Sequence, residues 1–340
     1  MAHQQDLPLT ALILGAGFSH AAGMPLTRDL LSGDTYVPSK TASKKWSSLL
    51  DDYEAWFHKN PGKGVEQYLA ELYSIEFGYR AELWSVAVHL ITATLGTPRH
   101  GESVAGRARY SSMITRGYRD AAHRAFWDVI LKGVDLTGVV TTNYDILIER
   151  SLRHRPMTGR PGFHYGGFPV PMKVLGWEDP FAGARRKVTV IEGRVPVCKL
   201  HGSVNWFVDH GSVHIHTDAR HAFSLRNPCA IVPPTPEKRI PGWLEPVWVA
   251  ARECLSSAHL WIVCGYSLPD YDIQVRDLLG RITPCPETVI LMVPHAERDK
   301  NRWKDLLHDA TIVTLPGLPE GVDVLRDLLP PEPWGQASGA

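Results

Sequence analysis

Four short segments of the chain place polar side chains directly after runs of apolar or β-branched residues. They read GAGFS at 15–19, TTNYD at 141–145, KLHGS at 199–203 and CGYSL at 264–268. Because ligands of open α/β sheets bind at the carboxyl ends of the strands, we expect these segments to meet in one site. Within them, a neutral histidine such as His201 suits the role of a general base, and Asn143 can hold a water or hydroxyl by hydrogen bonds.

Each of these residues also has a purely structural explanation. Asn143 can cap the helix that follows it, and Asp145 can be a first-turn helix charge. His201 can be a hydrogen-bonded histidine of the core. The occurrence of such residues at four strand ends together favours a functional site.

The first segment has the features of a phosphate-binding turn. A buried apolar run at 11–14 leads into Gly15 and Gly17, which permit a tight turn and a close approach of backbone N–H groups to a pyrophosphate. The usual dinucleotide fingerprint has a third glycine, and His20 stands in its place. The turn alone is therefore weak evidence for a nucleotide site.

Alternating strand and helix patterns predict an α/β fold with a Rossmann-like, doubly wound parallel sheet. The predicted strands lie at 11–14, 138–142, 258–263, 288–293 and 310–315, with a hairpin of two further strands at 187–191 and 195–200. The predicted helices lie at 46–57, 65–75, 79–95, 119–132, 146–153, 243–256, 270–282, 297–308 and 322–329. The Gly- and Pro-rich stretch 157–181 is expected to be an irregular loop.

The segment between the first two strands is too long for a simple crossover. We therefore predict one domain over 1–330, with a core at 8–32 and 134–330 and an inserted, mostly helical subdomain at about 33–133. The remaining residues, 331–340, are rich in Pro, Gly and Ser and are expected to be disordered.

The composition argues against several classes of protein. The 340 residues include 36 basic and 36 acidic side chains, so the net charge is zero and no direct binding of nucleic acid is expected. No apolar run approaches the length of a membrane span, and the start of the chain lacks a basic signal-peptide region. We therefore expect a cytoplasmic protein that does not bind membranes.

The spacing of cysteine and histidine residues predicts no metal site. The five cysteines include no C-x-x-C pair, and their odd number argues against a disulfide framework. Four histidines fall near a probable hairpin, and the pair at 214 and 216 would share one face of a strand. These histidines are His210, His214, His216 and His221. No carboxylate or cysteine completes a ligand set with them.

In order and spacing, the four polar segments resemble the signatures of the Sir2 (sirtuin) family, GAG-x-S, T-x-N-x-D, HG and G-x-S. The first segment continues as G-[IM]-P-x-x-R to Arg28, like the NAD-binding loop of that family. The phrases KLHGSVNW at 199–206 and GYSLPDYD at 265–272 are more similar to the bacterial SIR2-like effector branch, which typically lacks the zinc module of the deacylases. Leu26 and Thr27 stand where a sirtuin deacylase has Asp and Phe.

The resemblance implies that the four segments bind NAD+ and that no zinc is needed. It implies a catalytic set of His201, as general base, with Asn143 and Asp145. The residues implied in NAD+ binding are Gly15, Ala16, Gly17 and Ser19 at the pyrophosphate, Arg28 on the ribose–phosphate side, Thr142, Asn143 and Asp145 around the nicotinamide ribose and carboxamide, and Gly265 and Ser267 at the far phosphate or adenine ribose.

The function implied is NAD+ glycohydrolysis, in which nicotinamide leaves and water takes the ADP-ribosyl group. Because an unregulated NADase would harm its own cell, we expect a homo-oligomer, a regulatory protein encoded nearby, or both. The resemblance suggests an effector that depletes NAD+ in anti-phage defence. Two alternatives stay open: a NAD-dependent protein deacylase, disfavoured by the missing zinc cysteines, and a non-catalytic module that senses NAD or an ADP-ribose derivative.

Overall fold

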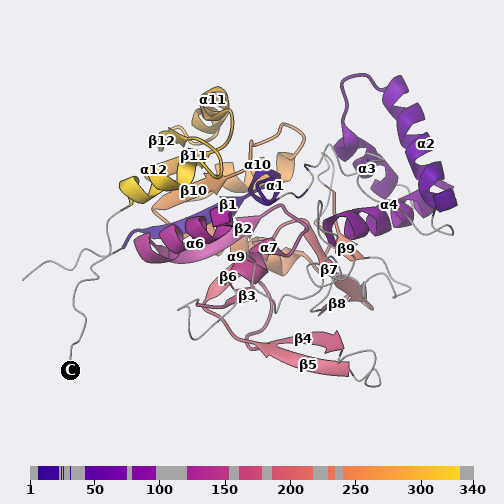
Figure 1. Ribbon diagram of the computed structural model, residues 1–340, viewed down its shortest axis with the longest axis horizontal. Helices are drawn as coiled ribbons and strands as arrows, with labels where there is room; N and C mark the ends of the chain where they lie inside the picture. Colours follow the sequence, from indigo (N-terminus) through magenta and orange to yellow (C-terminus); the bar gives the residue numbers. More distant parts are fainter. Residues whose placement is uncertain are drawn as a thin grey trace, which may run out of the picture.

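The structure is a computed structural model that describes residues 7–22, 24, 26, 31, 43–74, 79–96, 121–152, 161–177, 186–216, 229–233 and 240–329. A seven-stranded parallel sheet forms the middle of the molecule, with helices on either side of it (Figure 1). The segment 331–340, expected to be disordered, lies outside the described residues.

The central sheet has the strand order β12-β11-β10-β1-β2-β6-β3, and each neighbouring pair is parallel. Its strands are β1 (Leu9–Leu14), β2 (Asp135–Thr141), β3 (Phe163–Tyr165), β6 (Val195–Lys199), β10 (Leu260–Cys264), β11 (Thr288–Met292) and β12 (Thr311–Leu315). From β1 the order runs outward through β2 and β6 on one side and through β10, β11 and β12 on the other. The predicted doubly wound α/β fold is therefore confirmed. The strand order changes direction between β1 and β10, and open α/β sheets bind their ligands at such a point.

The middle strands are buried on both faces, as parallel strands between two helical layers must be. Residues Thr10 to Leu14 of β1 and all five residues of β10 are buried. Leu14 pairs with Cys264 on one side and with Thr141 on the other. Because the three strands end level with one another, the polar segments that follow them leave the sheet side by side.

Helices that connect the strands, or follow the last of them, cover the sheet. They are α1 (Ala16–His20), α6 (Ala121–Gly133), α7 (Leu147–Leu152), α9 (Glu245–Ser256), α10 (Ile273–Gly280), α11 (Ala296–Leu306) and α12 (Gly321–Leu328). α9 packs on β2 and β6, α11 packs on β11 and β12, and α6 packs on α7 and α12. Trp127, Trp261 and Trp303, which are fully buried, fill the core between these layers. Across the described part of the chain, no helix combines the length and apolar character needed to cross a bilayer.

The region between α7 and α9 contains two small antiparallel sheets. One pairs β4 (Met172–Trp177) with β5 (Arg186–Ile191). The other has the order β8-β7-β9, formed by β7 (Gly202–Asp209), β8 (Ser212–Ile215) and β9 (Cys229–Ile231). Figure 1 shows the β4–β5 ribbon projecting away from the central sheet.

Two predictions for this region are wrong. The strands at 187–191 and 195–200 do not form a hairpin, because β5 pairs with β4 whereas β6 joins the central sheet between β2 and β3. Burial explains the difference: Val197 of β6 is fully buried, whereas Val188 of β5 is exposed. The stretch 157–181, expected to be an irregular loop, contributes β3 and β4.

In the described residues between α1 and α6, a separate group of helices is formed by α2 (Ser43–Lys59), α3 (Val65–Ser74) and α4 (Tyr79–Gly96). They pack on one another, and α4 also contacts β7 and β9. Figure 1 shows the group beyond the carboxyl ends of the central strands. The helices predicted in this part of the chain are confirmed, and the bounds of an inserted subdomain remain a prediction.

Candidate active site

A cavity of about 560 Å³ lies at the carboxyl ends of the central strands, beside the point where the strand order reverses. The four predicted polar segments all contribute to its wall. The predicted residues that line it are Ala16, Gly17, Ser19, Thr142, Asn143, Asp145, His201, Gly265 and Ser267. Gly15 is buried next to them, and Arg28 lies outside the described residues. The cavity volume is in the range typical of small-molecule sites.

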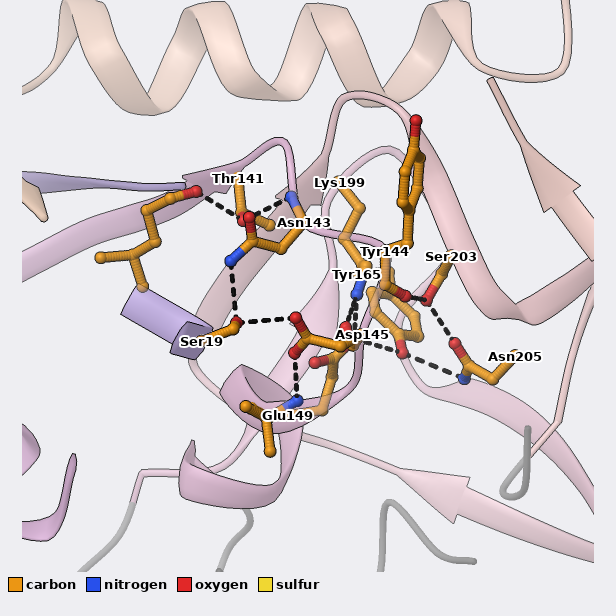
Figure 2. Close-up of polar contacts among 12 residues, drawn as sticks. Ser19, Thr141, Asn143, Tyr144, Asp145, Glu149, Tyr165, Lys199, Ser203 and Asn205 are labelled. Carbon is orange, nitrogen blue, oxygen red and sulfur yellow. Dashed lines mark hydrogen bonds and ion pairs between the residues drawn. The ribbon is translucent and has the colours of Figure 1, made fainter. Parts of the chain in front are cut away.

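Ser19, Asn143 and Asp145 form a hydrogen-bonded network on one wall (Figure 2). The side-chain nitrogen of Asn143 donates to Ser19 Oγ at 3.0 Å and to the backbone oxygen of Gly15 at 2.8 Å. Ser19 Oγ donates in turn to Asp145 Oδ2 at 2.6 Å. The network ties the turn after β1 to the turn after β2, so each turn holds the other in place.

The backbone of Asn143 is held by the last residue of β2. Thr141 Oγ1 accepts the N–H of Asn143 at 3.1 Å and donates to the backbone oxygen of Leu14 at 2.7 Å. A hydroxyl can accept and donate at once, so Thr141 links the end of β1 to the loop that carries Asn143.

Asp145 is the residue that caps α7. Its Oδ1 accepts the N–H of Leu147 at 2.9 Å, while its Oδ2 accepts the Ser19 hydroxyl. The residue is only 3% exposed. With a donor on each oxygen, the carboxylate holds Ser19 and the start of α7, which is a positioning role.

His201, which follows β6, lies beside a carboxylate that sequence reasoning did not assign to the site. Its Nε2 is 3.5 Å from Asp272 Oδ1, and Asp272 Oδ2 accepts the Tyr266 hydroxyl at 2.8 Å. All three residues are buried. Burial, together with the charge of Asp272, raises the pKa of Tyr266, so the phenol keeps the proton that it donates. Asp272 is thereby anchored through one oxygen and faces the imidazole with the other.

In the sequence, the feature that could have pointed to Asp272 as a site residue is its place at the end of the GYSLPDYD segment. At the sequence level it reads as a residue near the start of a helix, yet its side chain makes no capping hydrogen bond to α10. Only the folded loop after β10 turns this carboxylate toward His201.

A buried ion pair between Lys199 and Glu149 lies next to Asp145 (Figure 2). Lys199 Nζ is 3.0 Å from Glu149 Oε1, and it also donates to the backbone oxygen of Asp145. The Tyr165 hydroxyl donates to the same Glu149 oxygen at 2.9 Å. Lys199 therefore joins the end of β6 to α7 and to the Asp145 loop. Sequence reasoning gave neither Lys199 nor Glu149 a role.

Gly15 and Gly17 allow the end of β1 to lie close to the end of β10. The N–H of Gly15 donates to the backbone oxygen of Cys264 at 3.0 Å, and the N–H of Gly17 donates to that of Gly265 at 2.9 Å. The two amides expected to face a pyrophosphate are thus used within the protein. A Cβ at Gly17 would come within 2.8 Å of Gly265 Cα. Gly265 has a φ of +69°, and a Cβ there would overlap the backbone nitrogen of Phe18.

The cavity extends beyond the four segments in two directions. Toward the α2–α4 group it is lined by Glu66 and Leu95, and Glu66 Oε1 accepts the Tyr271 hydroxyl at 2.9 Å. Toward β11 and β12 the lining residues are Met292, Val293, Pro294, His295, Arg298, Asp299, Gly317 and Leu318. None of these residues was predicted, because they reach the cavity only through tertiary packing.

Within the described ranges, no three or more histidine, cysteine or carboxylate side chains are grouped to hold a metal. His210, His214 and His216 lie on or next to the β7–β8 hairpin, whereas His221 lies outside the described residues. Cys264, the last residue of β10, is buried. The absence of zinc stays a prediction.

Comparison with known proteins finds solved structures that match over most of the chain, and two of these are Sir2 proteins. No family model matches the chain, and no curated protein matches it. One structure is a Sir2 protein with an inhibitor, 2′-O-acetyl-ADP-ribose and a deacetylated p53 peptide, at 15% identity and a TM-score of 0.39, covering 94% of this chain and 92% of that chain. The other is a Sir2 mutant with a p53 peptide and NAD, at 15% identity and a TM-score of 0.37, covering 94% of this chain and 91% of that chain. Likeness of this degree does not identify a reaction.

Proposed function

We propose that the protein is a NAD+ glycohydrolase, which cleaves the bond between nicotinamide and ribose and transfers the ADP-ribosyl group to water. The observation that carries the proposal is the buried His201–Asp272 pair, which shares one cavity with the Ser19–Asn143–Asp145 network. A base held by a carboxylate, next to a wall of fixed polar groups, is what activation of a water molecule requires.

The walls of the cavity suit the parts of a dinucleotide. In our proposal the pyrophosphate lies over Ala16 and Gly17, and the nicotinamide ribose lies toward Asn143. The adenosine end extends past Gly265 and Ser267 toward β11. Arg298 also lies on that side, where it pairs with Asp299 at 3.2 Å, and Arg28 is proposed to close over the ribose–phosphate side.

In the proposed reaction, the bond between ribose C1′ and the pyridinium nitrogen breaks, and its electron pair moves to that nitrogen. The ribose becomes oxocarbenium-like, and a water oxygen forms the new bond to C1′. His201 takes the proton released by the water, and the charge of Asp272 stabilises the imidazolium that results. The proton later returns to solvent.

Asn143 and Asp145 have supporting roles in this proposal. Both protons of the Asn143 amide have acceptors in Gly15 and Ser19, so its side-chain oxygen is the atom offered to a water or to a ribose hydroxyl. An uncharged amide can orient that group without neutralising the cationic transition state. Asp145 fixes Ser19, and through it the amide of Asn143.

We keep a NAD-dependent deacylase and a non-catalytic NAD or ADP-ribose sensor as the alternatives. The absence of C-x-x-C pairs, together with Leu26 and Thr27 in the first loop, disfavours the deacylase. The pairing of His201 with Asp272 favours catalysis over sensing, because a sensor needs no oriented base. We further propose a cytoplasmic effector of anti-phage defence, regulated by oligomerisation or by a protein encoded nearby.

Chromatography of NAD+ incubated with purified protein tests the proposal. Nicotinamide and ADP-ribose in equal amounts are expected, whereas NAD+ consumption only when an acetylated peptide is added would identify a deacylase. His201→Ala should lose turnover by about 10²–10⁴-fold while still binding NAD+ in calorimetry. His259→Ala is the matched control, because His259 is exposed and precedes β10, at the opposite edge of the sheet. NAD+ binding without any product would favour the sensor.

A further inference from the structure

Two consecutive residues in the loop before α10 contact two different parts of the protein. Tyr271 donates its hydroxyl proton to Glu66 Oε1 at 2.9 Å, and Asp272 lies 3.5 Å from His201. Glu66 belongs to α3 in the α2–α4 group, whereas His201 follows β6 of the central sheet. One peptide unit therefore separates a contact to the inserted helices from a contact to the proposed base.

Glu66, which accepts the hydrogen bond of Tyr271, is a buried residue of α3. Glu66 is 7% exposed and lies in the first turn of α3, where the N–H of Gly64 donates to Gln67 Oε1 at 2.8 Å. Burial, and then the charge of Glu66, raises the pKa of Tyr271, so the phenol remains a donor to the carboxylate. Hydrogen bonds to charged, buried acceptors are among the stronger ones in proteins.

The Asp272 end is part of a compact loop. The N–H of Asp272 donates to the backbone oxygen of Pro269 at 3.2 Å, and the N–H of Arg276 donates to that of Asp272 at 3.0 Å. Tyr266 anchors the Asp272 carboxylate from the same loop. Tyr271 and Asp272 thus belong to one short turn, so the hydrogen bond between Tyr271 and Glu66 gives a further support to the segment that carries Asp272.

We propose that Glu66 and Tyr271 are positioning residues through which the α2–α4 group sets the geometry of the His201–Asp272 pair. With the hydrogen bond formed, Asp272 faces the imidazole. When α3 moves away, Tyr271 is released and Asp272 loses this support. The inference rests on the proposed hydrolysis of NAD+ and assigns a means of regulation to that same site.

Kinetics of four variants of the full chain test the link. Tyr271→Phe removes the hydroxyl and keeps the ring, and Glu66→Leu removes the acceptor. Each should lower kcat by about tenfold, the worth of one strong hydrogen bond, with KM for NAD+ changed by less than about twofold. The double variant should be no slower than either single one, because the same bond is lost. Glu66→Gln retains an acceptor and should recover most of the turnover lost in Glu66→Leu.

Glu82→Leu is the control for these variants, because Glu82 is exposed on α4 in the same helical group. Hydrogen–deuterium exchange gives a readout that does not depend on NAD+ cleavage. The amides of Asp272 and Arg276 should exchange faster in Tyr271→Phe than in the parent, while those of β10 stay unchanged.

Faster exchange in a protein that cleaves no NAD+ would support the link and reject the proposed hydrolysis. Three results would overturn the inference itself: unchanged exchange at Asp272, single-variant losses that multiply in the double variant, or a raised KM with kcat unchanged.

Discussion

Lys199 and Glu149 form an ion pair from which solvent is excluded, with 3.0 Å between Nζ and Oε1. The pair supports the candidate site, because Lys199 also donates to the backbone oxygen of Asp145 and precedes His201 by two residues. Removing two charges from water costs free energy, which only their mutual attraction and further hydrogen bonds offset. The structure is therefore sensitive to the loss of either partner.

Lys199→Met should lower the free energy of unfolding by about 3–5 kcal/mol, because it leaves the Glu149 carboxylate buried without its counter-charge. Among the described residues, Glu149 Oε2 has no hydrogen-bond partner that could compensate. Urea denaturation followed by tryptophan fluorescence measures the loss. Arg281→Met is the control: it breaks an exposed pair with Asp277, and surface pairs of this kind contribute little.

A second variant separates charge from packing at the same place. In Lys199→Met/Glu149→Leu both charges are gone, and two apolar side chains of similar length fill the space. We expect this double variant to recover part of the stability lost in Lys199→Met, because the buried charge is gone while the Tyr165 hydroxyl and the Asp145 carbonyl still lose their partners. If it were as unstable as the single variant, the buried charge would not be the cause of the loss.

Asp272→Asn should reduce the turnover of NAD+ by up to the whole contribution of a general base, about 10²–10⁴-fold. The substitution keeps the size of the side chain and removes the negative charge that stabilises the His201 imidazolium. Single-turnover rates measure the effect, and calorimetry should show NAD+ binding close to that of the parent. Asp277→Asn, at an exposed position of α10, is the matched control. Equal rates for the two variants would remove Asp272 from the mechanism.

Much of the central sheet could be predicted because several of its strands are short runs of apolar or β-branched residues. The segment at 11–14 and the apolar part of the predicted strand at 258–263 favour burial on both faces, and β1 and β10 are indeed buried strands of the parallel sheet. The pairing of β6 could not be predicted in the same way. A turn-like Glu192-Gly193 favours a hairpin locally, and the parallel contacts of β6 with β2 and β3 come from segments distant in the sequence.

The residues of the candidate site likewise divide into those that the sequence could predict and those that depend on tertiary packing. His201 and Asn143 follow strands directly, so the topology alone places them at the carboxyl edge. Asp272 and Glu66 reach the cavity through a folded loop and through the packing of α3. In the sequence each looks like a charge near a helix start, and a surface residue would give the same pattern.

The proposed reaction needs no zinc, and the metal content of the purified protein tests this. The sequence has no C-x-x-C pair, and the proposed mechanism assigns the proton transfer to His201 without a metal. We therefore expect no stoichiometric zinc in the purified protein by elemental analysis, and unchanged turnover after treatment with a chelator. One zinc per chain, lost together with activity on chelation, would contradict this and would direct attention to the histidines at 210–221.

The contact between Gly17 and Gly265 gives the last prediction. A methyl group at Gly17 would come within 2.8 Å of Gly265 Cα, and the N–H of Gly17 is bonded to the Gly265 carbonyl. The neighbouring backbone cannot move aside as a flexible side chain would. Gly17→Ala should therefore act first on the packing of the two strand ends, and destabilise the protein by about 1–3 kcal/mol, the usual cost of overpacking.

Thermal or urea unfolding of Gly17→Ala, measured without any nucleotide, makes this test independent of NAD+ binding. Gly242→Ala is the matched control, because a Cβ at Gly242 would meet no heavy atom within 4 Å. A Gly17→Ala protein as stable as the Gly242→Ala protein, but with weakened NAD+ binding, would mean that Gly17 is required by the ligand and not by the turn. A loss of stability in Gly17→Ala alone would show that the glycine is needed to bring β1 and β10 together, before any ligand is bound.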